Sequence, residues 1–153
     1  LLIRKDHIDN LETIIADNRS WVVSIKSAGN ILRGENYVYA LPEVRLNKNI
    51  TRKGEIIATE NISLANSDSE AVRKKIKLLL SSTLAEVKRR GSLSSELKVN
   101  ATQINNLGKN LVSIKKGDFT IIAKAIDNSQ SADKVSISLE LKSLDSTLIN
   151  NTK

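Results

Sequence analysis

Residues Trp21 to Glu60 read WVVSIKSAGN ILRGENYVYA LPEVRLNKNI TRKGEIIATE. Short runs rich in Val, Ile, Leu and Tyr are separated here by segments that contain Gly and Asn, which tolerate positive φ and form turns. The alternation of side chains in 21–26 and again in 37–46 predicts two strands. Pro42 has no backbone N–H donor, so it marks the end of the second strand or an edge position.

Three further strands are predicted C-terminal to these two. The first runs from Glu55 to Ile62, and the second, Phe119 to Ile126, is apolar enough for the interior of a sheet. In 135–142, aliphatic residues alternate with Ser, Glu and Lys, which is typical of a strand with one solvent-exposed face. The segment Asp127 to Asp133 would join the last two strands as a β-hairpin.

The clearest helix signal lies in residues 69–90. Aliphatic residues recur there at helical spacing: Val72, Ile76, Leu79, Leu80, Leu84 and Val87. Ser67 and Glu70 fit a capping box at the start, and Gly91 can take the left-handed conformation that ends a helix. A shorter helix is predicted around Ile104, Leu107, Leu111 and Ile114, with Asn100 as its cap.

Two segments give an ambiguous signal. In 2–15 the spacing of Ile8, Leu11, Ile14 and Ile15 suits a helix. However, Arg4 to Ile8 resembles Arg52 to Ile56, a turn that enters a strand, and this internal similarity favours a strand. Residues 92–95 read as a linker, and 92–100 carry no clear secondary-structure signal.

The order of elements predicts an α+β fold. We expect a mostly antiparallel sheet with one long and one shorter helix packed on it, and a terminal β-hairpin. The length of 153 residues favours one globular domain, which we place at 1–144, followed by a frayed tail at 145–153. The chain begins Leu1-Leu2-Ile3 and contains no Met, which predicts a fragment of a longer protein.

Composition and motifs argue against several kinds of chemistry. The chain has no Cys, so disulfides, thiolate metal sites and Cys nucleophiles are excluded. Its one histidine, His7, is predicted in a solvated loop, because metal sites and catalytic histidines need partner residues. Since no nucleophile or phosphate-binding motif is present, we expect a non-enzymatic protein without metal or cofactor. An enzyme that uses carboxylates as acid and base is an alternative.

Two sets of residues are candidates for binding. The first lies in predicted loops, where binding residues concentrate: Asn30, Arg33, Glu35, Arg52 and Lys53. The second belongs to the basic helix 69–90 and could contact phosphates: Arg73, Lys74, Lys77, Lys88, Arg89 and Arg90. An ordinary solvated helix surface would carry the same charges. Stacking aromatics for single strands are nearly absent, since aromatic residues make up 3% of the chain.

The chain resembles a cyanobacterial domain-of-unknown-function family in three stretches: Ser27-Ala28-Gly29-Asn30 with Gly34-Glu35, Arg52 to Ala58, and the charged helix that ends Lys88-Arg89-Arg90-Gly91. The resemblance runs from about Leu2 to Leu141. In that family the domain is the C-terminal globular part of a larger protein, after a membrane anchor and a long coiled coil. The resemblance implies a membrane-anchored protein whose soluble end is this domain, and it carries over no catalytic residue.

These observations together predict an interaction or scaffold module that binds a protein partner or self-associates. The net charge of +7 would also suit an anionic membrane surface. Nucleic-acid binding through the basic helix is the alternative.

Overall fold

The computed structural model describes residues 1–30, 33–34, 36–64, 69–114 and 116–144. The chain divides into two compact units, residues 1–48 (unit 1) and 49–153 (unit 2). Each unit is described by itself below. The expectation of one domain over 1–144 stays a prediction, and the tail 145–153 lies outside the described residues.

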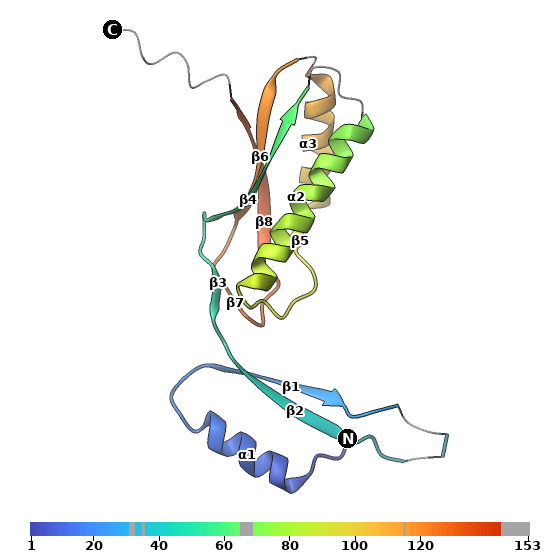
Figure 1. The fold of residues 1–153 in the computed structure, drawn as a ribbon, viewed down its shortest axis with the longest axis vertical. Coiled ribbons are helices and arrows are strands. Elements are labelled where there is room, and N and C mark those ends of the chain that lie inside the picture. Colours follow the sequence, from blue (N-terminus) through green and yellow to red (C-terminus); the bar gives the residue numbers. More distant parts are fainter. Residues whose placement is uncertain (31–32, 35, 65–68, 115, 145–153) are drawn as a thin grey trace. The chain divides into compact units, whose positions relative to one another are not determined.

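Unit 1 consists of a helix and a two-stranded antiparallel sheet (Figure 1): α1 (Lys5–Ile15), β1 (Trp21–Ser27) and β2 (Ala40–Leu46). Trp21 lies opposite Leu46, and Ser27 lies opposite Ala40. Both strands are edges in a sheet of two, so Pro42 has the edge position that the sequence predicts. The predicted start of this strand at residue 37 is wrong, because β2 begins at Ala40. Tyr39 forms only an isolated bridge with Leu2.

The strand favoured for 2–15 is wrong, because residues 5–15 form α1. The internal similarity between 4–8 and 52–56 misleads at one position: Gly54 takes a φ of +82°, and Asp6 stands in its place near the start of α1. A turn that needs a left-handed residue is therefore easy at Gly54 and costly at Asp6. His7 accordingly lies in a helix and not in a solvated loop, with its Nδ1 buried and without a hydrogen-bond partner among the described residues.

Unit 2 is built on a four-stranded sheet in the order β4, β6, β8, β5: β4 (Ile56–Ser63), β6 (Asp118–Ala125), β8 (Ser136–Ser143) and β5 (Lys98–Val99). The pairs β4–β6 and β6–β8 are antiparallel, while the short β5 runs parallel to β8. A second small sheet pairs β3 (Asn49–Thr51) with β7 (Ser129–Gln130). The strand β7 lies inside the segment 127–133, which was predicted as a hairpin loop. The helices α2 (Ser69–Arg89) and α3 (Ala101–Ser113) pack on one side of the large sheet (Figure 1). This arrangement confirms the predicted α+β fold.

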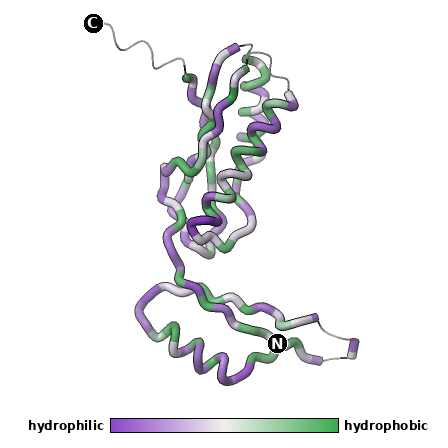
Figure 2. Tube along the Cα trace, viewed as in Figure 1, coloured by the Kyte–Doolittle hydropathy of each residue, from purple (hydrophilic) through white to green (hydrophobic). Residues whose placement is uncertain are grey.

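The core of unit 2 lies between these helices and the sheet. Hydrophobic residues recur at intervals along α2 (Figure 2), and all six predicted aliphatic residues contribute to the core. Val72, Ile76, Leu79 and Val87 are buried, and the other two are partly buried. Alternate residues of β6 and β8 face the same core, including Ile121 and Ile137, each 0% exposed.

Local hydrogen bonds fix the start of α3 and the end of α2. The Asn100 side chain accepts from the backbone N–H of Thr102 at 2.8 Å, as an N-cap does. At the end of α2, Gly91 has a φ of +108°, and the N–H of Ser92 donates to the Val87 carbonyl at 3.0 Å. This bond is that of a Schellman motif, and the positive φ confirms the left-handed helix end that was predicted at Gly91. The proposed capping partner Ser67 lies outside the described residues.

Candidate functional site

A groove of about 680 Å³ runs between α2 and α3. Its lining joins the start of α2 to the end of α3, since Ser69 and Ser113 both contribute. The floor is apolar and comes from both helices: Val72, Ile76, Leu80, Ile104, Gly108 and Val112. Val112 is 46% exposed, so part of this apolar surface remains open to solvent.

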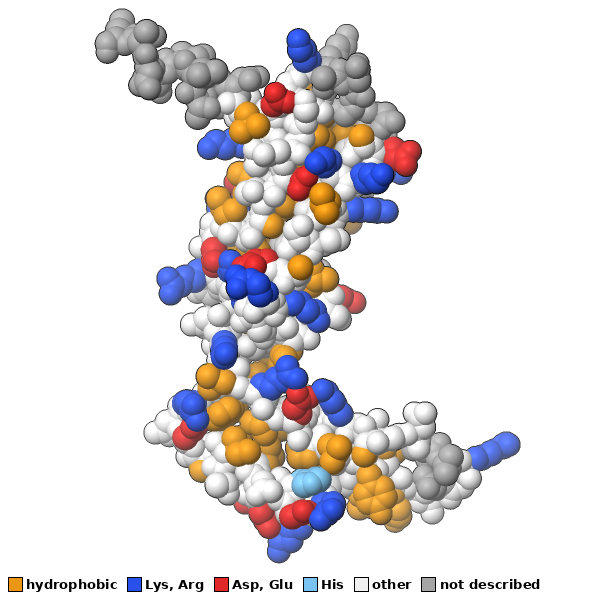
Figure 3. Space-filling model, in the orientation of Figure 1, with side chains coloured by type: hydrophobic (Ala, Val, Ile, Leu, Met, Phe, Trp, Pro, Cys, Tyr) orange, Lys and Arg blue, Asp and Glu red, His pale blue; other side chains and the backbone are white. Residues whose placement is uncertain are grey.

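The rim of this groove is cationic. Arg73 and Lys77 of α2 and Lys109 of α3 line it, and no described residue in the lining is an Asp or Glu. None of the three forms an ion pair with a carboxylate of the described residues. Figure 3 shows Lys and Arg side chains beside hydrophobic ones on the face of unit 2 in view. The groove thus combines apolar contact area with uncompensated positive charge.

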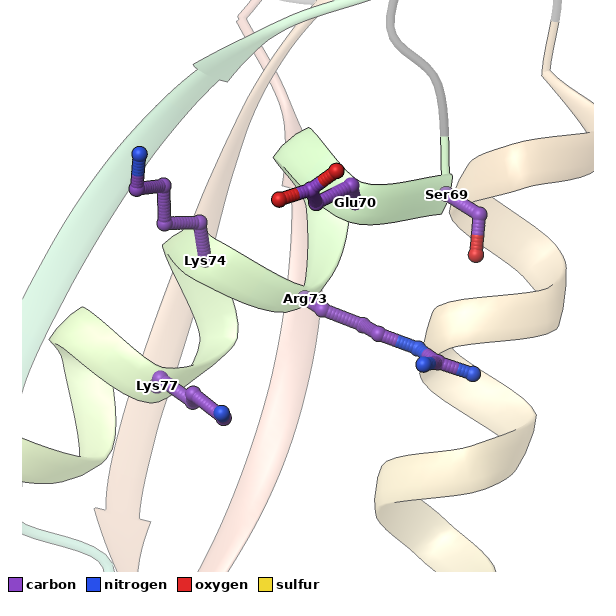
Figure 4. Close-up of a pocket in the computed structure, with 5 residues that line it drawn as sticks. All are labelled: Ser69, Glu70, Arg73, Lys74 and Lys77. Atoms are coloured by element: carbon purple, nitrogen blue, oxygen red, sulfur yellow. The ribbon is translucent and has the colours of Figure 1, made fainter.

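A second depression on α2 adjoins the groove (Figure 4). Arg73 extends toward α3, while Lys74 points to the other side of the helix, where it lines a hollow beside Ile62 of β4. Glu70 is the one carboxylate among the described residues around this depression. Arg73, Lys74 and Lys77 of the predicted basic helix therefore line one depression, although Arg73 and Lys74 point to different sides of α2.

The basic residues at the other end of α2 have a structural role instead. Glu86 accepts hydrogen bonds from Arg89 and Arg90, each at 2.8 Å, and these bonds lower the pKa of Glu86 to about 2. Arg90 also pairs with Glu55 at 2.6 Å and donates to the Ile50 carbonyl. Arg90 therefore links the end of α2 to β3 and to the turn before β4. Lys88 is exposed, three turns away from Lys77.

The predicted loop residues fall in both units. Asn30 and Arg33 are exposed in the β1–β2 connection of unit 1, and Glu35 lies outside the described residues. Arg52 and Lys53 belong to unit 2, where they line an open depression of about 590 Å³. The N–H of Arg52 donates to Glu55 and that of Lys53 donates to Asn128, so their backbone is fixed while their side chains are exposed. Partner contact by these residues stays a prediction.

Two carboxylates line a further depression, which lies beside β7. Asp127 and Asp133 contribute to it, together with Lys98 and Lys134. Asp133 accepts a hydrogen bond from the backbone N–H of Gln130 at 2.7 Å, which stabilises the turn after β7. In the ranges that the structure describes, no three His, Asp or Glu side chains form a possible metal site.

The residues of α3 in the groove were not predicted as site residues. Asn105 and Lys109 are ordinary polar positions of an amphipathic helix, and Gly108 interrupts the pattern of that helix. Gly108 is a signal in the sequence that could have indicated the groove, because a glycine in a helix interior often has a packing or functional reason.

Comparison with known proteins gives a distant relative of unknown activity. The chain is 34% identical over 83 residues to an uncharacterized protein of a Nostoc species. The match covers 54% of this chain and 17% of that protein. No protein-family model matches the chain, and no solved structure matches it. A cyanobacterial relative without a characterized function is therefore shown, and the family suggested by the sequence stays a proposal.

None of the helices in the described residues is both long enough and apolar enough to cross a lipid bilayer.

Proposed function

We propose that this chain is a non-enzymatic interaction module that binds a protein partner through the groove between α2 and α3. The observation that carries the proposal is the combination of an apolar floor with a rim of Arg73, Lys77 and Lys109. Binding surfaces on proteins commonly pair an apolar centre with a polar rim. Arg is also enriched at such surfaces.

The wider context of the module is part of the same proposal. The resemblance to the cyanobacterial family suggests that the module is the soluble end of a membrane-tethered coiled-coil protein. The Nostoc relative is much longer than the matched 83 residues, which is consistent with additional segments in proteins of this kind. Fractionation of cells that express the complete gene would test the tether: we expect the protein in the membrane fraction, and recovery in the soluble fraction would contradict it.

Nucleic-acid binding is a second candidate, favoured by the cluster of Arg73, Lys74 and Lys77. The structure weakens the case for the other half of the basic helix, because Arg89 and Arg90 are paired with carboxylates. An apolar groove floor also gains nothing from a phosphate backbone. Binding of this type would lose affinity steeply with salt.

Site-specific photo-cross-linking in a lysate of the source organism would test the module. A photoreactive side chain would replace Asn105 in the groove, and a matched control would carry it at Thr59, which is exposed in β4. We expect a protein adduct at position 105 that is absent at position 59 and is suppressed by Lys77→Glu. A nucleic-acid adduct would support the second candidate, and the absence of a protein adduct at position 105 would refute the proposal.

A further inference from the structure

We infer that the groove between α2 and α3 takes an acidic amphipathic helix of the partner protein. This inference rests on the proposed function and adds the chemistry of the partner. Three features of the groove support it: its length, its apolar floor and the sign of its charge.

The length and shape of the groove suit a helix. The residues of α2 that line it run from Ser69 to Leu80, which at 1.5 Å per residue is about 17 Å, or three helical turns. A third helix laid along two packed helices presents side chains at i, i+3 or i+4, and i+7 to such a groove. The groove therefore offers room for one apolar stripe of about three side chains.

Gly108 opens the floor of the groove. A Cβ atom at this position would meet only the Ile76 Cδ1, at 4.0 Å, which is an ordinary van der Waals contact. Any larger side chain at 108 would therefore extend into the space that the partner needs. Around Gly108 the apolar surface is partly open, since Val112 is 46% exposed.

The charge of the rim selects an acidic partner. Arg73 and Lys77 flank the groove on α2, and Lys109 flanks it on α3. No described carboxylate neutralises them, so Asp and Glu on both flanks of an incoming helix would find cations on each side. A basic helix would meet three like charges instead, which gives the groove its selectivity.

A synthetic peptide tests this inference directly. The probe is an 18-residue fluorescent helix with Leu at i, i+3, i+7 and i+10 and with Glu on both flanks. Fluorescence polarisation with the whole chain should show saturable binding that weakens as salt rises. A peptide of the same composition in scrambled order, and one with Lys in place of Glu, should each bind at least tenfold more weakly. Equal binding of either control would overturn the inference.

Protein variants locate the binding site. The double variant Arg73→Glu/Lys77→Glu should weaken binding of the peptide at least tenfold, while Lys142→Glu, an exposed charge reversal in β8, should leave it unchanged. Gly108→Leu should abolish binding by filling the groove and should keep or raise the thermal midpoint, because Leu favours a helix over Gly. Wild-type affinity in a folded Gly108→Leu variant would overturn the inference.

The remaining outcomes separate this inference from the proposed function. Tighter binding of an oligonucleotide duplex or of anionic vesicles, with displacement of the peptide, would overturn the choice of an acidic helix. A protein cross-link at position 105 without any peptide binding would refute the acidic helix as the partner but would still support the proposed interaction module. Absence of a protein cross-link at position 105 would refute the proposed function itself.

Discussion

Replacing Gly108 by Ala should stabilise the protein, although glycine lies where the two helices approach each other. Gly108 is in the interior of α3, which spans 13 residues, and it does not have a positive φ. A glycine in a helix interior costs about 1 kcal/mol relative to alanine, because the flexible glycine loses more backbone freedom on folding.

The space around Gly108 determines whether Gly108→Ala gives this full stabilisation. A Cβ at position 108 would meet only the Ile76 Cδ1, at 4.0 Å, so no atom of α2 has to move. We therefore expect the full gain of about 1 kcal/mol in the free energy of unfolding. For a body of about 100 residues this raises the thermal midpoint by roughly 4 °C.

Circular dichroism at 222 nm during thermal and urea unfolding measures this effect. With a urea m-value of about 2 kcal/mol/M, the midpoint should rise by roughly 0.5 M. The neighbouring variant Lys109→Ala is a suitable control, because Lys and Ala differ by only a few tenths of a kcal/mol in helix propensity. A fall in stability for Gly108→Ala would mean that α2 approaches α3 more closely than described, and the groove would then be narrower than argued.

Three other predictions concern the core, a helix end and pH. Leu79→Ala should lower the free energy of unfolding by about 3–4 kcal/mol in urea titrations, because Leu79 is 0% exposed. The control Leu78→Ala should cost less than about 1 kcal/mol, because Leu78 is 49% exposed. Similar losses for the two variants would contradict the packing of α2. Gly91→Ala should cost about 1–2 kcal/mol in thermal unfolding, because a φ of +108° strains any side chain, and a neutral result would contradict the described helix end. The lowered pKa of Glu86, about 2 against an ordinary 4.5, contributes stability that is complete above pH 4.5 and lost as pH falls toward 2. The urea midpoint of Glu86→Gln should therefore fall less than that of the wild type between pH 5 and pH 2, and parallel curves would show that Glu86 is not linked to folding.

Much of the fold of unit 2 follows from local signals. The alternation in 135–142 predicts β8 and its exposed face, and the aliphatic spacing in α2 predicts its buried side. Asn100 and Gly91 mark two helix ends correctly. Each of these features depends only on residues that are close in sequence, within one strand or within one or two helical turns. The local sequence is therefore sufficient to predict it.

The candidate site could not be predicted from local patterns alone, because it depends on contacts between residues far apart in sequence. The basic helix was predicted as one charged surface, but Glu55 and Glu86 neutralise its end, and Glu55 lies 35 positions before Arg90. The groove joins Arg73 and Lys77 to Lys109, which belongs to another helix. Periodicity indicates which side of each helix is apolar, but it does not give the partner that each side meets.

The sequence alone determined the kind and order of the longer elements of unit 2, which are β4, α2, α3, β6 and β8, because period, caps and turn residues act over short distances along the chain. It did not predict the short strands β3, β5 and β7. A helix at 5–15 was already one of two interpretations of the sequence, and the structure shows that it is the right one. Only the tertiary structure decided that β5 joins the sheet parallel to β8, and that three cations from α2 and α3 share one apolar groove. Those outcomes depend on which distant segments pack together. Their energies come from contacts between residues far apart in the chain, and a local pattern does not encode them.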